Sequence, residues 1–167
     1  MDKSVVYFAK HDGLVVLKLV GQFAFSLDSS KALNAFIDEV LTNEEYENIL
    51  IDLSETESLD STNLGLLAIL TRIMMDLYDR KATIISTNED INEILDSVGF
   101  PEVFHILHDP HNPEADWEKL PEAEASEKEL TRIVLNAHQE LLELNEKNKD
   151  MFQDVVDMLQ REVEKET

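Results

Sequence analysis

Residues 49–70 have the sequence ILIDLSETESLDSTNLGLLAIL, the strongest structural signal in the chain. The apolar run over 49–53 predicts a buried strand, which a short polar segment ends. Asp60, Ser61 and Thr62 then open a second apolar run with residue types that favour helix N-caps. The pattern therefore predicts a strand, a loop and a helix in succession, with the Ser61 hydroxyl at the N-terminus of the helix.

A hydroxyl at this position faces backbone N–H groups that have no partner within the helix, and the positive end of the helix dipole. Ser61 is therefore either a helix cap or a position for a phosphate group. Phosphorylation would add about −1.5 to −2 charges, which the helix N-terminus would partly stabilise. α/β folds place ligand sites at the carboxyl ends of their strands, which favours the second interpretation. A phosphate here would disturb the docking of a surface complementary to the bare hydroxyl.

The flanking segments continue the alternation of strands and helices. Asp12-Gly13 lies between two strand-like runs and predicts a β-hairpin. The order β-β-α-β-α-β-α-β predicts an α/β fold with a STAS-like arrangement, a mixed β-sheet flanked by α-helices, because the opening hairpin is antiparallel. The expected strands are 4–9, 14–20, 48–53, 82–86 and 103–107, and the expected helices are about 30–41, 62–78 and 90–98.

Beyond residue 107 the character of the sequence changes. Prolines and few apolar residues predict a linker over 107–125, between a domain at 1–106 and an extension at 126–167. The extension has apolar residues at helical spacing, which predicts an amphipathic helix, or two helices with a break at 145–150 and Asp150 as the second cap. Its apolar stripe must be buried on the domain, on a second copy or on another protein.

The composition narrows the classes of partner. The chain has 36 acidic and 14 basic residues and a net charge of −22, which opposes direct binding to nucleic acid or anionic membrane and favours a basic partner. The absence of cysteine excludes disulfides, thiolate catalysis and thiolate metal sites. No apolar stretch approaches the roughly 20 residues that span a bilayer, and the N-terminus does not resemble a signal peptide. We therefore expect a cytoplasmic protein.

Signals for catalysis and cofactors are weak. The four glycines, at 13, 21, 65 and 99, form no phosphate-binding loop, and no nucleophile elbow is present. His105, His108 and His111, with Asp109 nearby, form the most metal-like cluster, but two prolines in the segment leave the spacing without a fixed geometry. We expect no enzyme activity, no cofactor and no metal site.

The segment Asp60-Ser61-Thr62-Asn63-Leu64-Gly65, with its leading hairpin, following strand and a later Val-Gly-Phe at 98–100, resembles the STAS domain of anti-sigma factor antagonists. The resemblance covers about residues 3–106. The family signature is approximately Asp-Ser-(Ser/Thr/Ala)-Gly-(Leu/Ile)-(Gly/Ala). Asn63 stands where Gly is usual, and we expect the exchange to be tolerated because Asn accepts unusual backbone angles.

The resemblance implies a bacterial anti-anti-sigma factor, a phosphoprotein of signal transduction and transcription regulation. The unphosphorylated form would bind and sequester an anti-sigma factor, often a serine kinase, and so free a sigma factor. Phosphorylation of Ser61, with Thr62 as a secondary acceptor, would release the partner, and a PP2C-type phosphatase would restore binding. The residues expected to bind the partner are Asp28, Ser58, Asp60, Asn63, Leu64, Thr87 and Asn88.

Two questions stay open at the level of sequence. The alternative function is a scaffold subunit of a stress-sensing signalling assembly built from STAS domains. The helical extension lies outside the minimal family domain and resembles that of a longer class of bacterial antagonists. It would bind the anti-sigma factor, form a dimer, dock a second effector or fold back on its own domain.

Overall fold

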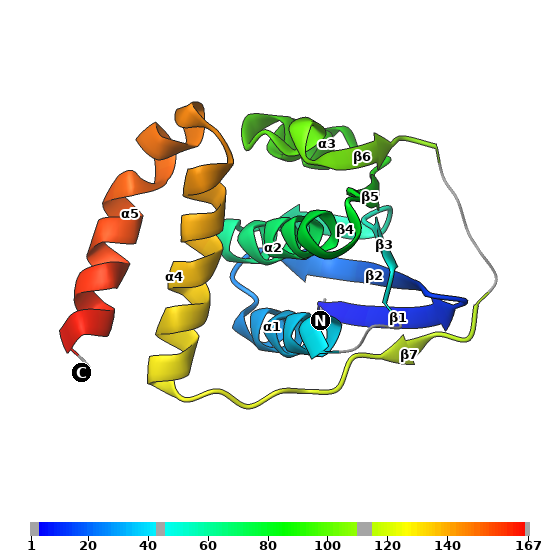
Figure 1. Ribbon diagram of the computed structural model, residues 1–167, viewed down its shortest axis with the longest axis horizontal. Helices are drawn as coiled ribbons and strands as arrows, with labels where there is room; N and C mark the ends of the chain where they lie inside the picture. Colours follow the sequence, from blue (N-terminus) through cyan, green and yellow to red (C-terminus); the bar gives the residue numbers. More distant parts are fainter. Residues whose placement is uncertain (1–3, 43–45, 110–114, 166–167) are drawn as a thin grey trace.

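The structure, a computed structural model, describes residues 4–42, 46–109 and 115–165 (Figure 1). Its helices are α1 (Leu27–Thr42), α2 (Ser61–Tyr78), α3 (Glu89–Ser97), α4 (Glu127–Leu144) and α5 (Glu146–Lys165), with a 3₁₀ turn, η1, at Phe100–Glu102. Its strands are β1 (Val5–His11), β2 (Leu14–Phe23), β3 (Asn48–Asp52), β4 (Thr56–Leu59), β5 (Ala82–Ile85), β6 (Phe104–Leu107) and β7 (Glu118–Lys119).

The sheet is mixed, as the sequence predicts. Its strand order is β6-β5-β3-β2-β1-β7, and β4 pairs separately with the end of β2. β1 and β2 are antiparallel, and the turn between them has Asp12 at φ 46° and Gly13 at φ 84°. Two consecutive positive φ angles match the right-handed twist of a hairpin, which is why Asp-Gly favours this turn. From β2 to β6 the neighbouring strands are parallel, so their carboxyl ends share one edge.

Strand β4 does not appear among the predicted strands. Its sequence, TESL, has no apolar run, and it pairs only with the last residues of β2, beyond an irregularity at Gly21 and Gln22. The Thr56 hydroxyl donates to the Leu19 carbonyl oxygen over 2.7 Å and secures the pairing. α1 also begins at Leu27, earlier than predicted, so the loop between β2 and α1 is short. Both differences bring the residues before α1 against those before α2.

α2 is enclosed by other elements, as its nearly continuous apolar sequence predicts. It packs against α1, against β3 and β5 of the sheet, and against α4. Side chains around most of its circumference are buried, among them Leu66, Leu67 and Leu70 with no exposed surface. None of the described helices has the length and apolarity that crossing a bilayer requires.

The extension forms two helices that fold back on the domain. Figure 1 shows α4 lying between α2 and α5. The chain breaks at Asn145, whose side-chain oxygen accepts a hydrogen bond from the Asn148 N–H over 2.9 Å. The break is where the sequence predicts it, but Asn145 is the capping residue and the prediction of Asp150 is wrong. β7 adds a short strand beside β1 within the predicted linker, so part of the linker belongs to the sheet.

Candidate functional site

The N-terminal end of α2, residues 60–63, is called the mouth of α2 below, and Asp60 holds it together through hydrogen bonds. Asp60 is the N-cap residue, and its Oδ1 accepts a hydrogen bond from the Asn63 N–H over 2.9 Å. Its other oxygen, Oδ2, accepts from the Phe25 N–H over 2.8 Å, which ties the loop before α1 to the start of α2. Because Asp60 performs the capping, the Ser61 hydroxyl is not needed for it.

The Ser61 hydroxyl instead meets a side chain from the extension. Ser61 Oγ lies 2.8 Å from Nε2 of His138, which belongs to α4. The other ring nitrogen, Nδ1, lies 2.7 Å from the carbonyl oxygen of Val134, one turn earlier in α4. A carbonyl oxygen only accepts, so in a neutral imidazole Nδ1 carries the proton and Nε2 accepts a hydrogen bond from the Ser61 hydroxyl. Ser61 is half-buried, whereas its neighbour Thr62 is buried, with only 8% of its surface exposed.

Two further contacts hold α4 along the same face of α2. Gly65 faces the Ala137 backbone so closely that an added Cβ would lie 2.7 Å from the Ala137 Cα and closer still to its carbonyl oxygen. The absence of a side chain at Gly65 is therefore what allows this approach. Arg72 donates from Nε to the Glu140 carboxylate over 2.7 Å, and this hydrogen bond raises the pKa of the Arg72 guanidinium.

Asn63 lies inside the fold, with no exposed surface. Its amide nitrogen donates to the Phe23 carbonyl oxygen over 2.9 Å, and its amide oxygen accepts from the Ser30 hydroxyl over 2.9 Å. Asn63 does not have a positive φ angle, so the expected reason for Asn at this position is wrong. The side chain is instead a buried hydrogen-bonding bridge between α2, β2 and α1, and neighbouring Leu64 is also buried.

The other predicted partner-binding residues lie nearer the surface. Ser58 Oγ accepts from the Ala24 N–H over 3.2 Å, so the loops before α1 and α2 are linked twice, here and through Asp60. Asp28 is exposed and lies 3.9 Å from the Lys31 ammonium. Thr87 is exposed, and Asn88 caps α3 by accepting from the Asp90 N–H. α3 packs against β4, which places this third loop at the same end of the sheet.

Phe25, in the loop before α1 and bonded to Asp60, lies beside the predicted partner-binding residues but is not among them. Its side chain is 93% exposed and its φ angle is 62°, in the left-handed region that bulky residues rarely adopt. Leu27, two residues later, is 46% exposed. A large aromatic side chain held out in a strained backbone conformation is a feature that proteins retain at binding sites. Within the local sequence, no signal distinguishes Phe25 from a core phenylalanine.

His138 is a second residue of the site that the sequence does not predict. It lies 77 residues from Ser61 along the chain, between apolar residues of an amphipathic helix. A lone histidine in such a pattern is usually a partly buried residue of the apolar face. Its position is recognisable only once α4 is known to pack on α2.

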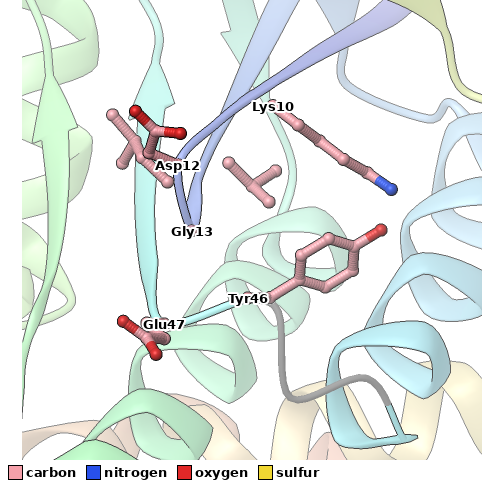
Figure 2. Close-up of a pocket in the computed structure, with 7 residues that line it drawn as sticks. Lys10, Asp12, Gly13, Tyr46 and Glu47 are labelled. Atoms are coloured by element: carbon pink, nitrogen blue, oxygen red, sulfur yellow. The ribbon is translucent and has the colours of Figure 1, made fainter.

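The described pockets lie away from Ser61. Figure 2 shows one of them at the β1–β2 turn, lined by Asp12, Gly13 and Glu47, with the Lys10 ammonium over the Tyr46 ring at 4.8 Å from its centroid. β2 starts beside this pocket and ends at Phe23, next to the loop that Asp60 holds. The pocket is therefore at the opposite end of the sheet from the mouth of α2.

The histidine cluster at 105–111 is only partly described, since His111 lies outside the described residues. His105 and His108 are exposed, and His108 Nδ1 lies 3.1 Å from the Ser86 carbonyl oxygen. Within 4–42, 46–109 and 115–165, no group of three or more potential ligands is arranged to hold a metal ion.

A comparison with models of known protein families matches residues 7–112 to the STAS domain. The matched stretch begins in β1, contains the whole mouth of α2 and ends beyond β6. The comparison with curated proteins gives no match.

Proposed function

Because the chain belongs to the STAS domain family, we propose that it is a binding module controlled by phosphorylation of Ser61, and not an enzyme. In this proposal it is a cytoplasmic antagonist of an anti-sigma factor, which is often also a serine kinase. The form with a bare Ser61 hydroxyl binds the anti-sigma factor and so releases a sigma factor for transcription. Phosphorylation ends the binding, and a PP2C-type phosphatase restores it.

The environment of Ser61 supports this proposal more than any other observation. The residue lies at the first position of α2, where backbone N–H groups and the helix dipole favour an added anion. Asp60 already caps the helix, so modification of the hydroxyl leaves the cap intact. Ser61 is also more exposed than Thr62, which makes it the better acceptor for a kinase. A switch of this kind acts by charge and size at the surface, without refolding the domain.

The first prediction concerns Ser61 itself. Ser61→Asp places a carboxylate at the mouth of α2 and is expected to weaken capture of the anti-sigma factor at least about 10-fold, because a buried unpaired charge opposes docking. Ser61→Ala, which adds neither charge nor bulk, is expected to retain capture. Affinity purification with each variant as bait, followed by mass spectrometry, measures the difference.

Ser97→Asp is the matched control, since Ser97 is exposed at the end of α3 and bonds only locally to the Ile94 carbonyl oxygen in the contacts described. It should capture the partner as the unmodified chain does. Equal recovery of the same anti-sigma factor by Ser61→Asp and Ser61→Ala would contradict the proposed switch.

The second prediction concerns Phe25. We propose that its exposed ring inserts into an apolar pocket of the partner, beside Ser58 and Asp60, and that the acidic chain favours a basic rim around that pocket. Phe25→Ala is expected to weaken the complex about 10-fold or more, as removal of a central aromatic residue typically does.

The same variant should keep its melting temperature to within a few degrees, because the ring has little contact with the rest of the chain. Titration calorimetry with the captured partner measures the affinity, and thermal melting followed by circular dichroism measures the stability. An affinity equal to that of the unmodified chain would remove Phe25 from the interface.

A further inference from the structure

We infer that the face of α2 from Ser61 to Arg72 is a helix-docking surface, and that α4 occupies it only while Ser61 carries no phosphate. The inference rests on the proposed function for one point, that Ser61 becomes phosphorylated. Its occupant is a segment of this chain, residues 127–144, and the contacts of that segment with α2 carry the argument.

The contact residues of α2 share one face of the helix. Ser61, Gly65 and Arg72 are four and seven residues apart, the spacing that places side chains above one another on a helix. On α4 they meet His138, Ala137 and Glu140 in turn. The apolar residues of α4 that this docking buries include Ile133, Ala137 and Leu141, with at most 7% of their surface exposed. The surface therefore combines apolar burial with a polar contact at each end.

The close approach at Gly65 makes this surface intolerant of a larger group at Ser61. The Gly65 backbone lies directly against the Ala137 backbone, with no flexible side chain between them to adjust. His138 follows Ala137 in the sequence and its ring reaches Ser61 over 2.8 Å. A phosphate group on Ser61 Oγ would compete with the imidazole for the space between the two helices. Because the Ala137 backbone already lies against Gly65, α4 has no room to shift while that contact holds, so making room for the phosphate separates α4 from α2 around this contact.

The hydrogen bond also depends on the unmodified hydroxyl. In the neutral imidazole, Nε2 accepts the hydrogen bond that the Ser61 hydroxyl donates. A phosphoserine has no proton on Oγ, and its phosphate brings about −1.5 to −2 charges against the acceptor nitrogen. α4 and α5 together carry ten acidic and six basic residues, so the hairpin as a whole adds no positive field to compensate. With a neutral imidazole, charge and size therefore act in the same direction, against docking.

The consequence is that α4 covers Ser61, the proposed phosphorylation site. In the bare form α4 lies on the Ser61 hydroxyl, so a kinase, and equally a partner that docks on this hydroxyl, acts on the fraction of molecules in which α4 has opened. Once modified, Ser61 keeps α4 away. The turn at the far end of the hairpin has its own connection to the domain, because the Asn148 amide donates to the Val98 carbonyl oxygen over 2.9 Å. We expect α4 to be released from α2 while this turn still holds.

Hydrogen exchange on the full chain, without any partner, tests the inference. Phosphoserine is incorporated at position 61 by genetic code expansion, with phosphoserine at position 97 as the matched control and Ser61→Ala as a second control. The amides of residues 133–141 are expected to exchange at least about 10-fold faster with phosphoserine at 61 than in the unmodified chain. The control with phosphoserine at 97 should match the unmodified chain, and Ser61→Ala, which loses one hydrogen bond, should change exchange only a few-fold.

Unchanged or stronger protection of residues 133–141 would overturn the inference, because α4 would then stay docked on α2 with the phosphate present. Equal loss of protection in β2 and β3 would also overturn it, since the modification would then unfold the domain. The result is independent of the anti-sigma partner. Release of α4 together with equal capture by Ser61→Asp and Ser61→Ala would therefore leave this inference standing and reject the proposed function.

Discussion

Gly65→Ala is expected to lower the free energy of unfolding by about 3 kcal/mol, because the added methyl group collides with the backbone of α4. Its Cβ would lie 2.5 Å from the Ala137 carbonyl carbon and 2.7 Å from the Ala137 Cα, well inside contact distance. The sign is diagnostic, since Gly→Ala within a helix ordinarily stabilises it by about 0.5–1 kcal/mol. Urea denaturation followed by circular dichroism measures the change.

Arg72→Ala is the comparison on the same face of α2. Its contact with Glu140 is made by side chains, and the Arg72 side chain is about half exposed, so the free energy of unfolding should fall by no more than about 1 kcal/mol.

Hydrogen exchange of Gly65→Ala should show the loss of protection concentrated in α4. A Gly65→Ala variant as stable as the unmodified chain would mean that α2 and α4 do not pack this closely in solution.

Asn63→Asp is expected to lower the free energy of unfolding by about 2–3 kcal/mol, although the two side chains have nearly the same shape. The substitution replaces the amide that donates to the Phe23 carbonyl oxygen with a carboxylate oxygen, at a site with no exposed surface. The new charge lies in the first turn of α2, where the helix dipole favours it by about 0.3–1 kcal/mol. The cost of a buried carboxylate facing a carbonyl oxygen exceeds that gain.

Asn136→Asp provides the matched control, because Asn136 is an exposed residue of α4. Its effect should stay within about 0.5 kcal/mol. Chemical denaturation of both variants at neutral pH gives the comparison. If Asn63→Asp were as stable as Asn136→Asp, the buried bridge between α2, β2 and α1 would not contribute as described.

The predictions from sequence succeed where the signal is local. The Asp12-Gly13 turn, the N-terminus of α2 after Asp60 and the break near Asn145 each depend on residues within a few positions of one another. The sequence does not predict β4, because its polar residues form a strand only through pairing with β2. The sequence predicts Asn63 at a partner surface, whereas the structure places it in the interior, because the groups that it bonds come from β2 and α1.

Neighbouring residues along the chain account for the α/β alternation, the mixed sheet and the placement of the Ser61 hydroxyl at a helix mouth, since capping and periodicity act over one or two turns. Packing between distant segments accounts for the meeting of Ser61 with His138 and for the cover that α4 forms. An amphipathic stripe predicts that one face of a helix will be buried, but it does not identify the surface that buries it. For α4, that surface is the face of α2 at Gly65, which forms only once the chain has folded.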